Sequence, residues 1–188
     1  MSKFEILPDN TKFIDFDQLK DELKTKNREG FLISDVILIL LFSHKKKPVY
    51  GRTLLMKQIF LLYEEILSKT DINVQDPKFI PYIYGPYSFN VMQVIEDLFF
   101  SGSIIIKGRK NSRNETFKIS DKVASKASDK FSQLPMDIQK NILESRISWD
   151  QLGTDGILRY VYFKYPLFKE KSKIKEKYAD INWGKGKA

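Results

Sequence analysis

The sequence predicts a mainly α-helical protein with one small β-hairpin, in which a winged-helix-like core is flanked by extra N- and C-terminal helices. The first observation behind this fold class is the order of patterns across residues 34–120, where helix, helix, helix and hairpin follow one another. The second is a Tyr-Gly-Pro-Tyr-Ser turn just before a strongly apolar helical pattern. The third is a pair of short β-prone runs around a basic loop. Because a winged helix usually binds another molecule, this fold class predicts binding rather than a reaction.

Composition fits a single globular domain, since the 188 residues are 42% hydrophobic and 30% charged. The chain has no cysteine, which excludes disulfides, zinc–thiolate sites and thiol catalysis. Residues 1–14 are expected to form an N-terminal arm, and they lack the apolar run of a signal peptide. The longest apolar run, Val36–Phe42, has seven residues and is too short to cross a bilayer. We therefore expect a cytoplasmic protein with no membrane partner.

The first helical patterns lie between residues 15 and 43. Residues 15–27 place apolar side chains at helical spacing and predict a short amphipathic helix, which Gly30 ends. Ser34 is a suitable N-cap for a helix through Val36–Ser43 that is apolar on almost every side and is therefore expected to be buried. Pro48 forbids its continuation.

The next helix is predicted over Leu54–Lys69, after a Gly-Arg-Thr start at residues 51–53. Its apolar stripe consists of Leu55, Ile59, Leu62 and Ile66. Two apolar helices joined by a Pro/Gly turn resemble a helix-turn-helix pair. Residues 71–79 form a polar connection to the following turn.

The third helix and the hairpin complete the predicted core. Pro86 suits the first position of a helix that ends near Ser101, with Gly102 as the C-terminal stop. Residues 104–106 and 116–119 predict the two strands of the hairpin, with a long loop between them.

The remainder of the chain, residues 121–168, is expected to be helical. Residues 121–131 and 135–147 each predict an amphipathic helix. Thr154 is a candidate N-cap for a third helix over Asp155–Tyr165, and Pro166 ends it. Residues 169–188 form a lysine-rich tail with one further helical turn near residues 174–178.

The net charge of +8 makes an anionic partner worth considering. The excess is concentrated in residues 45–57, residues 107–118 and the tail. The predicted third helix, Ser88–Ser101, contains no Lys or Arg, although a DNA-reading helix normally presents such residues to bases and phosphates. We expect its buried side to carry Phe89, Met92, Ile95, Leu98 and Phe99, and its outer face to carry Asn90, Gln93 and Asp97. A carboxylate on that face repels phosphate, which argues against ordinary major-groove reading.

Three features allow more than one interpretation. Tyr82, Tyr84 and Tyr87 either pack the turn onto the core or form an aromatic surface for a partner. The predicted wing tip carries four cations that either contact phosphates or keep a hairpin end solvated, namely Lys107, Arg109, Lys110 and Arg113. The aromatic segment 155–166 either packs internally or forms a homodimer surface.

Catalytic and metal-binding patterns have little support in the sequence. His44 is the only histidine and stands next to three lysines, without an obvious acidic partner for triad or metal chemistry. A nuclease-like set of Asp9, Glu22 and Lys24 places its last two members on a predicted helix rather than a strand. There is no phosphate-binding Gly-rich loop. We expect no catalytic residue, no metal site and no cofactor.

The motifs GRTLLMKQIFLLYEEI, FIPYIYGPYSFNVMQVIEDLFFSGSI and FKIS resemble the Panacea or SocA-like antitoxin domains and the related YwgA-like proteins of prokaryotes. The resemblance covers about residues 34–120, and YVYFKYPLFKEKSKIK is similar to a tail of YwgA-like members. It implies a winged-helix-like domain that works through protein contacts, which in the antitoxin branch neutralises or delivers a toxin. Its fold-defining positions here are Leu55, Lys57, Tyr84, Gly85 and Pro86. Tyr87 departs from the small aliphatic residue of the antitoxin pattern, as do the long arm and tail.

These observations predict a non-enzymatic regulator or adaptor that binds a partner protein. Its expected surface combines the turn with the outer face of the third helix, through Tyr82, Tyr84, Tyr87, Asn90, Gln93 and Asp97. The alternative is a nucleic-acid-binding regulator that contacts phosphates through the basic wing and tail.

Overall fold

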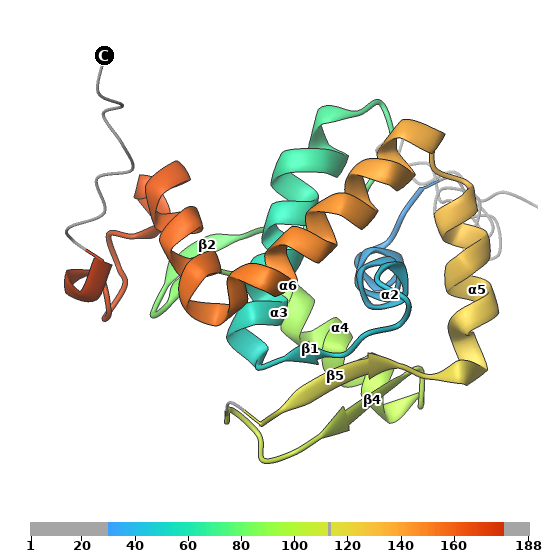
Figure 1. The fold of residues 1–188 in the computed structure, drawn as a ribbon, viewed down its shortest axis with the longest axis horizontal. Coiled ribbons are helices and arrows are strands. Elements are labelled where there is room, and N and C mark those ends of the chain that lie inside the picture. Colours follow the sequence, from blue (N-terminus) through green and yellow to red (C-terminus); the bar gives the residue numbers. More distant parts are fainter. Residues whose placement is uncertain (1–29, 113, 179–188) are drawn as a thin grey trace, which may run out of the picture. The chain divides into compact units, whose positions relative to one another are not determined.

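The computed structural model describes residues 30–112 and 114–178, which include a compact unit that begins at Phe31. The predicted arm, the helix over residues 15–27, the nuclease-like set, Arg113 and the last part of the basic tail lie outside the described residues. Within them the chain is mainly helical with small antiparallel sheets, as predicted (Figure 1). No helix in this part of the chain has both the length and the apolarity needed to cross a membrane.

The helices follow the predicted order. They are α2 (Ile33–Ser43), α3 (Arg52–Leu61), α4 (Phe89–Phe100), α5 (Asp121–Ser132) and α6 (Met136–Lys164). A π-helical turn, Leu62–Ile66, and a 3-10 turn, Leu67–Lys69, extend α3 to the predicted end of that helix. Two short 3-10 turns follow α6, η3 (Pro166–Phe168) and η4 (Glu176–Tyr178), and η4 lies where the tail was predicted to make a further turn.

Helix α2 forms the centre of the core, as its almost continuous apolar sequence predicts. It is seen end-on in the middle of Figure 1, with α6 crossing beside it and α5 along another side. It contacts α3, α4, α5, α6 and strand β5 (Thr116–Ile119). Its apolar side chains from Ile33 to Leu41 are buried. The helix begins at Ile33, one residue before the predicted cap, and the Leu32 N–H donates to Asp35 Oδ2 at 3.1 Å.

The predicted hairpin is present as β4 (Ile104–Lys107) and β5, and it belongs to a larger sheet. Strand β1 (Val49–Tyr50) pairs with the other edge of β5, which gives the strand order β1-β5-β4. Alternation along the strands buries Ile104, Phe117 and Ile119 against the helices. The opposite face exposes Ile105 and the lysines of β4 and β5.

A second hairpin corrects the prediction of a single one. Strands β2 (Ile80–Tyr82) and β3 (Gly85–Tyr87) pair antiparallel, so Pro86 lies in a strand and not at the start of the helix. Helix α4 begins at Phe89, where the Ser88 hydroxyl caps it by accepting from the Val91 N–H at 3.0 Å. The misplacement has a physical reason, because the proline φ near −65° is compatible with a helix start and with extended backbone.

The two C-terminal helices predicted on either side of Thr154 are present, and they follow each other so directly that together they make up α6. The only non-helical residue within it is Gly153, with φ of 61°. The predicted interruption of the helix is therefore present, but it lies at Gly153, one residue before the predicted cap Thr154.

Candidate protein-binding surface

Three of the residues that the family resemblance marks as fold-defining meet beneath the β2–β3 hairpin. Lys57, on α3, is 2% exposed and its Nζ donates to the Pro86 carbonyl at 2.8 Å. Gly85 has φ of 84°, and a Cβ at this position would lie 2.7 Å from Tyr162 Cε1. A larger residue at Gly85 would therefore be strained and would also clash with α6. The β2–β3 hairpin therefore packs on both α3, through Lys57, and α6, through Tyr162.

Burial sets the charge state of Lys57. Desolvation disfavours the ammonium form and lowers the pKa of Lys57 to about 7. Its one hydrogen bond, to a neutral carbonyl, does not offset the desolvation of the ammonium group. At neutral pH a large fraction of the protein molecules therefore carries a neutral amine at Lys57.

Above this support, three aromatic rings form what we call the aromatic surface: Tyr82, Tyr87 and Phe89. The ring centroids are 5.0 Å apart for Tyr82–Tyr87, 5.6 Å for Tyr82–Phe89 and 5.0 Å for Tyr87–Phe89. Tyr82 is 38% exposed and Phe89 is 57% exposed, whereas Tyr87 is partly buried and packs against the core. Tyr84, at the tip of the hairpin, is 49% exposed. Tyr87 therefore packs the turn onto the core, as the first interpretation expects, and the use of these tyrosines as a surface for a partner stays a prediction.

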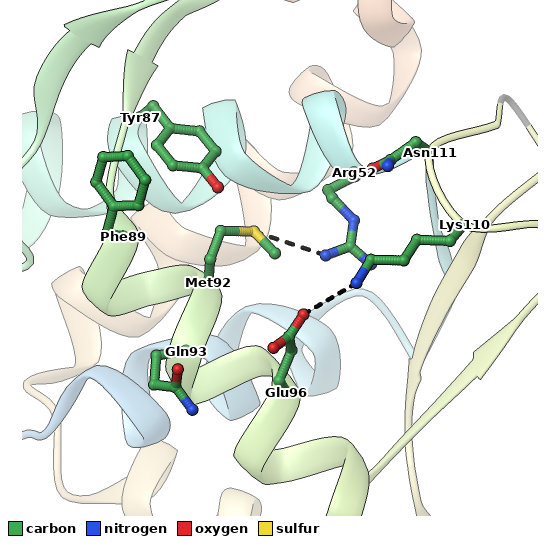
Figure 2. Close-up of a pocket in the computed structure, with 8 residues that line it drawn as sticks. All are labelled: Arg52, Tyr87, Phe89, Met92, Gln93, Glu96, Lys110 and Asn111. Carbon is green, nitrogen blue, oxygen red and sulfur yellow. Dashed lines mark hydrogen bonds and ion pairs between the residues drawn. The ribbon is translucent and has the colours of Figure 1, made fainter.

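A pocket of about 360 Å³ opens beside the aromatic surface (Figure 2). Its apolar wall consists of Tyr87, Phe89 and Met92, while polar and charged side chains of α4 and of the β4–β5 loop, the predicted wing, form the other side. Arg52 lies across its base, with Nη1 3.8 Å from Met92 Sδ. Burial raises the pKa of the Tyr87 hydroxyl although Arg52 acts in the opposite direction.

Buried charge fastens the wing loop to this pocket. The Arg52 guanidinium donates to both carboxylate oxygens of Glu115, at 3.2 and 2.5 Å, and Glu115 is 1% exposed. The Asn111 N–H donates to the same carboxylate at 2.9 Å. Gly108 allows the loop to close, since a Cβ there would lie 2.2 Å from the Asn114 carbonyl oxygen. Arg52 is thus neutralised by its partner and positions the wing.

The outer face of α4 carries Asn90, Gln93 and Asp97 as exposed residues, as expected. Gln93 Nε2 donates to Asp97 Oδ1 at 3.0 Å. The predicted buried side was wrong for Phe89 and Phe99, which are 57% and 43% exposed. Helical spacing put both on the apolar stripe, but they lie at the ends of α4, where the core no longer covers the helix.

The cations of the wing are not equivalent. Lys107, Arg109 and Lys110 are exposed, but Lys110 Nζ forms an ion pair with Glu96 Oε1 at 3.2 Å. In the tail, Lys177 pairs with Asp155 at 2.8 Å and Lys169 Nζ donates to the Tyr178 carbonyl at 3.0 Å. Some of the basic side chains that were considered for an anionic partner therefore already form interactions within the protein.

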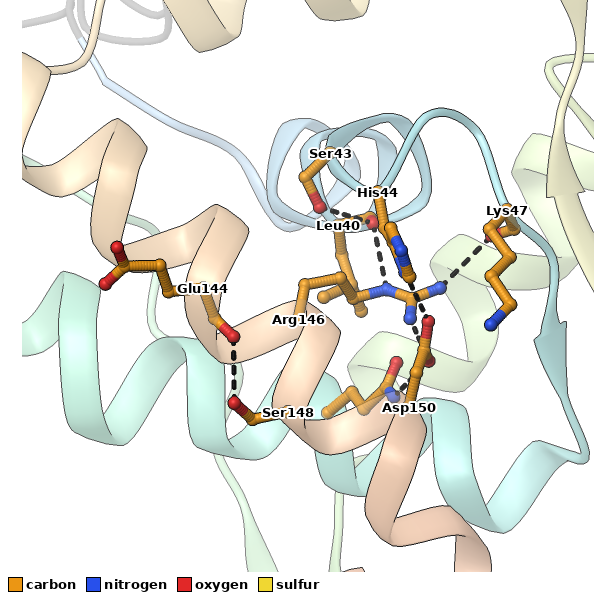
Figure 3. A network of polar contacts seen from close by, with 9 residues as sticks. Leu40, Ser43, His44, Lys47, Glu144, Arg146, Ser148 and Asp150 are labelled. Atoms are coloured by element: carbon orange, nitrogen blue, oxygen red, sulfur yellow. Dashed lines mark hydrogen bonds and ion pairs between the residues drawn. The ribbon is translucent and has the colours of Figure 1, made fainter.

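A buried polar network between the C-terminal end of α2 and helix α6 was not predicted (Figure 3). Asp150, on α6, accepts hydrogen bonds from His44 Nδ1 at 2.8 Å and from Gln58 Nε2 at 3.0 Å, and pairs with Arg146. His44 therefore has the acidic partner that its sequence neighbourhood does not show. Burial raises the pKa of Asp150, and the hydrogen bonds from Arg146, Gln58 and His44 outweigh it, so that the net shift is downward. Arg146 is fully buried and also donates to the carbonyls of Leu40 and Lys47, at 3.3 and 3.1 Å.

This network links elements of the core, and nothing in its geometry resembles a triad. Its serine neighbour, Ser43, donates to the Leu40 carbonyl at 3.0 Å and not to His44. Among the described residues, no group of three His, Cys, Asp or Glu side chains is placed to hold a metal ion. The only sequence signal for the network was the i, i+4 spacing of Arg146 and Asp150 on one predicted helical segment.

Segment 155–166 packs mainly inside the protein. Ile157, Leu158, Val161 and Tyr162 are buried. Tyr160 and Tyr165 donate hydroxyl hydrogen bonds to Glu65, at 2.9 and 3.2 Å. Phe163, at 54% exposure, is the most exposed aromatic side chain of this segment.

Comparison with known protein families and with curated protein sequences finds no match. The geometry of the described residues therefore carries the functional argument.

Proposed function

We propose that this protein is a non-enzymatic interaction module, a winged-helix-like regulator or adaptor that binds a partner protein through the aromatic surface and the adjoining pocket. The observation that carries the proposal is the contact among the rings of Tyr82, Tyr87 and Phe89 at the edge of a pocket, where Tyr82 and Phe89 are exposed. Large aromatic side chains contribute most to binding where they lie next to a pocket that a partner can fill.

Rigidity supports this use of the surface. The Lys57–Pro86 hydrogen bond, the close approach of Gly85 to Tyr162 and the Ser88 cap hold the hairpin and the start of α4 in place. A preorganised surface loses little conformational entropy when a partner binds. Because these contacts already fix the hairpin, its exposed aromatic side chains are available to contact a partner.

The charges around the pocket define the chemistry of the partner. Lys110 neutralises Glu96, and Asp97 on the same helix has only a neutral amide as its hydrogen-bond donor. Helix α4 contains no Lys or Arg. The expected partner segment therefore inserts an apolar side chain between Phe89 and Met92 and carries a basic residue toward Asp97. This mode agrees with the resemblance to antitoxin domains, which work through protein contacts.

Replacing Phe89 with alanine should weaken partner binding at least about fivefold, because truncating an aromatic anchor at the centre of an interface typically costs more than about 1 kcal/mol. The partner is first captured from an extract of the source organism on the full-length chain, then purified and titrated by calorimetry. Phe163→Ala is the matched control, since Phe163 is 54% exposed against 57% for Phe89 and lies on the second half of α6. Equal dissociation constants for Phe89→Ala and the wild type would contradict the proposal.

A nucleic-acid-binding role is the second candidate, favoured by exposed Lys107, Lys118 and Tyr50 in the sheet and by exposed Arg109 in the loop after β4. Such a surface would bind with an affinity that falls steeply as salt rises. Retention of duplex DNA in dilute buffer that is lost in Arg109→Ala and kept in Phe89→Ala would favour this candidate over the protein partner.

A further inference from the structure

Strand β4 leaves one edge of the three-stranded sheet unpaired among the described residues. It pairs with β5 on one side only, in the order β1-β5-β4. The Ser120 N–H donates to the Ser103 carbonyl, which makes Ser103–Ser120 a hydrogen-bonded pair of the antiparallel ladder. By alternation, the backbone groups of Ile105 and Lys107 face β5, and those of Ile104 and Ile106 face the unpaired edge.

Exposed apolar side chains lie in this strand and just before it in the chain. Ile105 is 41% exposed, and Phe99 and Phe100, which end the preceding helix, are 43% and 83% exposed. Natural proteins usually protect an edge strand with charge, proline or a bulge, because a bare edge is a template for pairing with another chain. In β4 the only such residue is Lys107 at its end.

We propose that β4 pairs antiparallel with β4 of a second copy, about a two-fold axis through Ile105, so that two sheets join into one continuous sheet. In this register Ile104 lies opposite Ile106 of the second copy, and each such pair exchanges both backbone hydrogen bonds. Ile105 meets its own counterpart as a non-hydrogen-bonded pair, in which the side chains approach most closely. This is the register that uses the outward backbone groups of Ile104 and Ile106 in both copies.

Charge favours a second copy as the occupant. In this register Lys107 lies opposite Ser103 of the second copy and not opposite another lysine, which avoids a destabilising like-charge pair. The pairing ends at Lys107, because Gly108, with φ of 87°, begins the loop that closes onto Asn114. An isologous contact of this kind closes after two copies, so it leads to a dimer and not to a fibre.

The dimer would be compatible with the proposed function and does not depend on it. Phe89 and Phe100 are at opposite ends of α4, which has 12 residues and is about 18 Å long. Each copy would therefore keep its aromatic surface accessible. Two such surfaces in one assembly would bind a multivalent partner more tightly than one.

Light scattering of the full-length chain over a wide concentration range tests the pairing. The wild type should dimerise, and Ile105→Lys should remain monomeric, because the substitution places two ammonium groups face to face across the axis. Ile147→Lys is the matched control, since Ile147 is 40% exposed against 41% for Ile105 and lies on α6. A monomeric wild type, or a dimer that persists in Ile105→Lys and is lost in Phe163→Ala, would overturn the proposal.

Disulfide formation gives a second readout that does not require a lysine in the sheet. The chain has no cysteine, so a single introduced thiol can cross-link only to its own counterpart. Ile105→Cys should form a covalent dimer under mild oxidation, because the two Cβ atoms of a close antiparallel pair lie near the distance that a disulfide needs. Lys107→Cys, whose counterpart lies farther along the strand, should cross-link much more slowly. Equal rates for the two variants would contradict the register.

Discussion

Replacing Arg146 with methionine should lower the free energy of unfolding by about 3–5 kcal/mol, the usual cost of removing one partner of a buried ion pair. The Arg146 side chain is fully buried, and its partner Asp150 is 7% exposed. Without the guanidinium, the Asp150 carboxylate keeps only His44 and Gln58 as hydrogen-bond partners. The carbonyls of Leu40 and Lys47 also lose the donor that links the end of α2 to α6.

Arg159→Met is the matched control for this measurement by urea denaturation. Arg159 also forms an i, i+4 ion pair on α6, with Asp155 at 2.9 Å, but its side chain is 46% exposed and that of Asp155 is 51% exposed. An exposed pair of this kind contributes about 0–1 kcal/mol. Similar losses of stability for the two variants would show that the buried network does not connect α2 and α6 as described.

The second large effect is a dependence of stability on pH that arises from Lys57. Burial lowers the pKa of Lys57 in the folded protein to about 7, against about 10.4 in an unfolded chain. Between these values the unfolded state binds a proton that the folded state does not bind, so stability rises with pH. The expected rise between pH ~7.5 and ~9.5 is about 2–3 kcal/mol, at up to about 1.4 kcal/mol per pH unit. Below the folded pKa both states are protonated, and this contribution to the slope disappears.

Urea denaturation of the wild type and Lys57→Met at a series of pH values measures this contribution as the difference between their slopes. The methionine variant lacks the titrating amine, so the extra rise should be absent from it. Because the substitution also removes the donor to the Pro86 carbonyl, a direct titration of the Lys57 13Cε resonance in the wild type provides an independent check. A resonance that titrates only near the pKa of an ordinary lysine would contradict the burial of a neutral amine.

Much of the fold follows from periodicity in the sequence. The stripe in α3, the continuous apolar run of α2 and the β-prone runs around the wing each predict the element that the structure contains. The errors occur where local pattern is ambiguous. Pro86 satisfies a helix start and a strand equally well, and the Gly85 turn that decides between them depends on Tyr162, which lies 77 positions later in the chain.

The candidate site was predictable in part. The Tyr-Gly-Pro-Tyr-Ser turn correctly indicated where aromatics gather, but Phe89 was assigned to the core because helical spacing does not show where burial ends along a helix. Lys57 was included as a motif position, while its burial depends on packing by α6. The pairing of His44 with Asp150 spans 106 positions, and the single sequence contains no signal that joins them.

Hydrogen exchange of the full-length chain, with and without its purified partner, tests the central proposal most directly. If the aromatic surface is the binding site, the partner should slow exchange of the amides in residues 80–93, which contain Tyr82, Tyr87 and Phe89. Exchange in the second half of α6 should be unchanged. Protection confined to the wing and the outer face of the sheet, with residues 80–93 unaffected, would contradict the account.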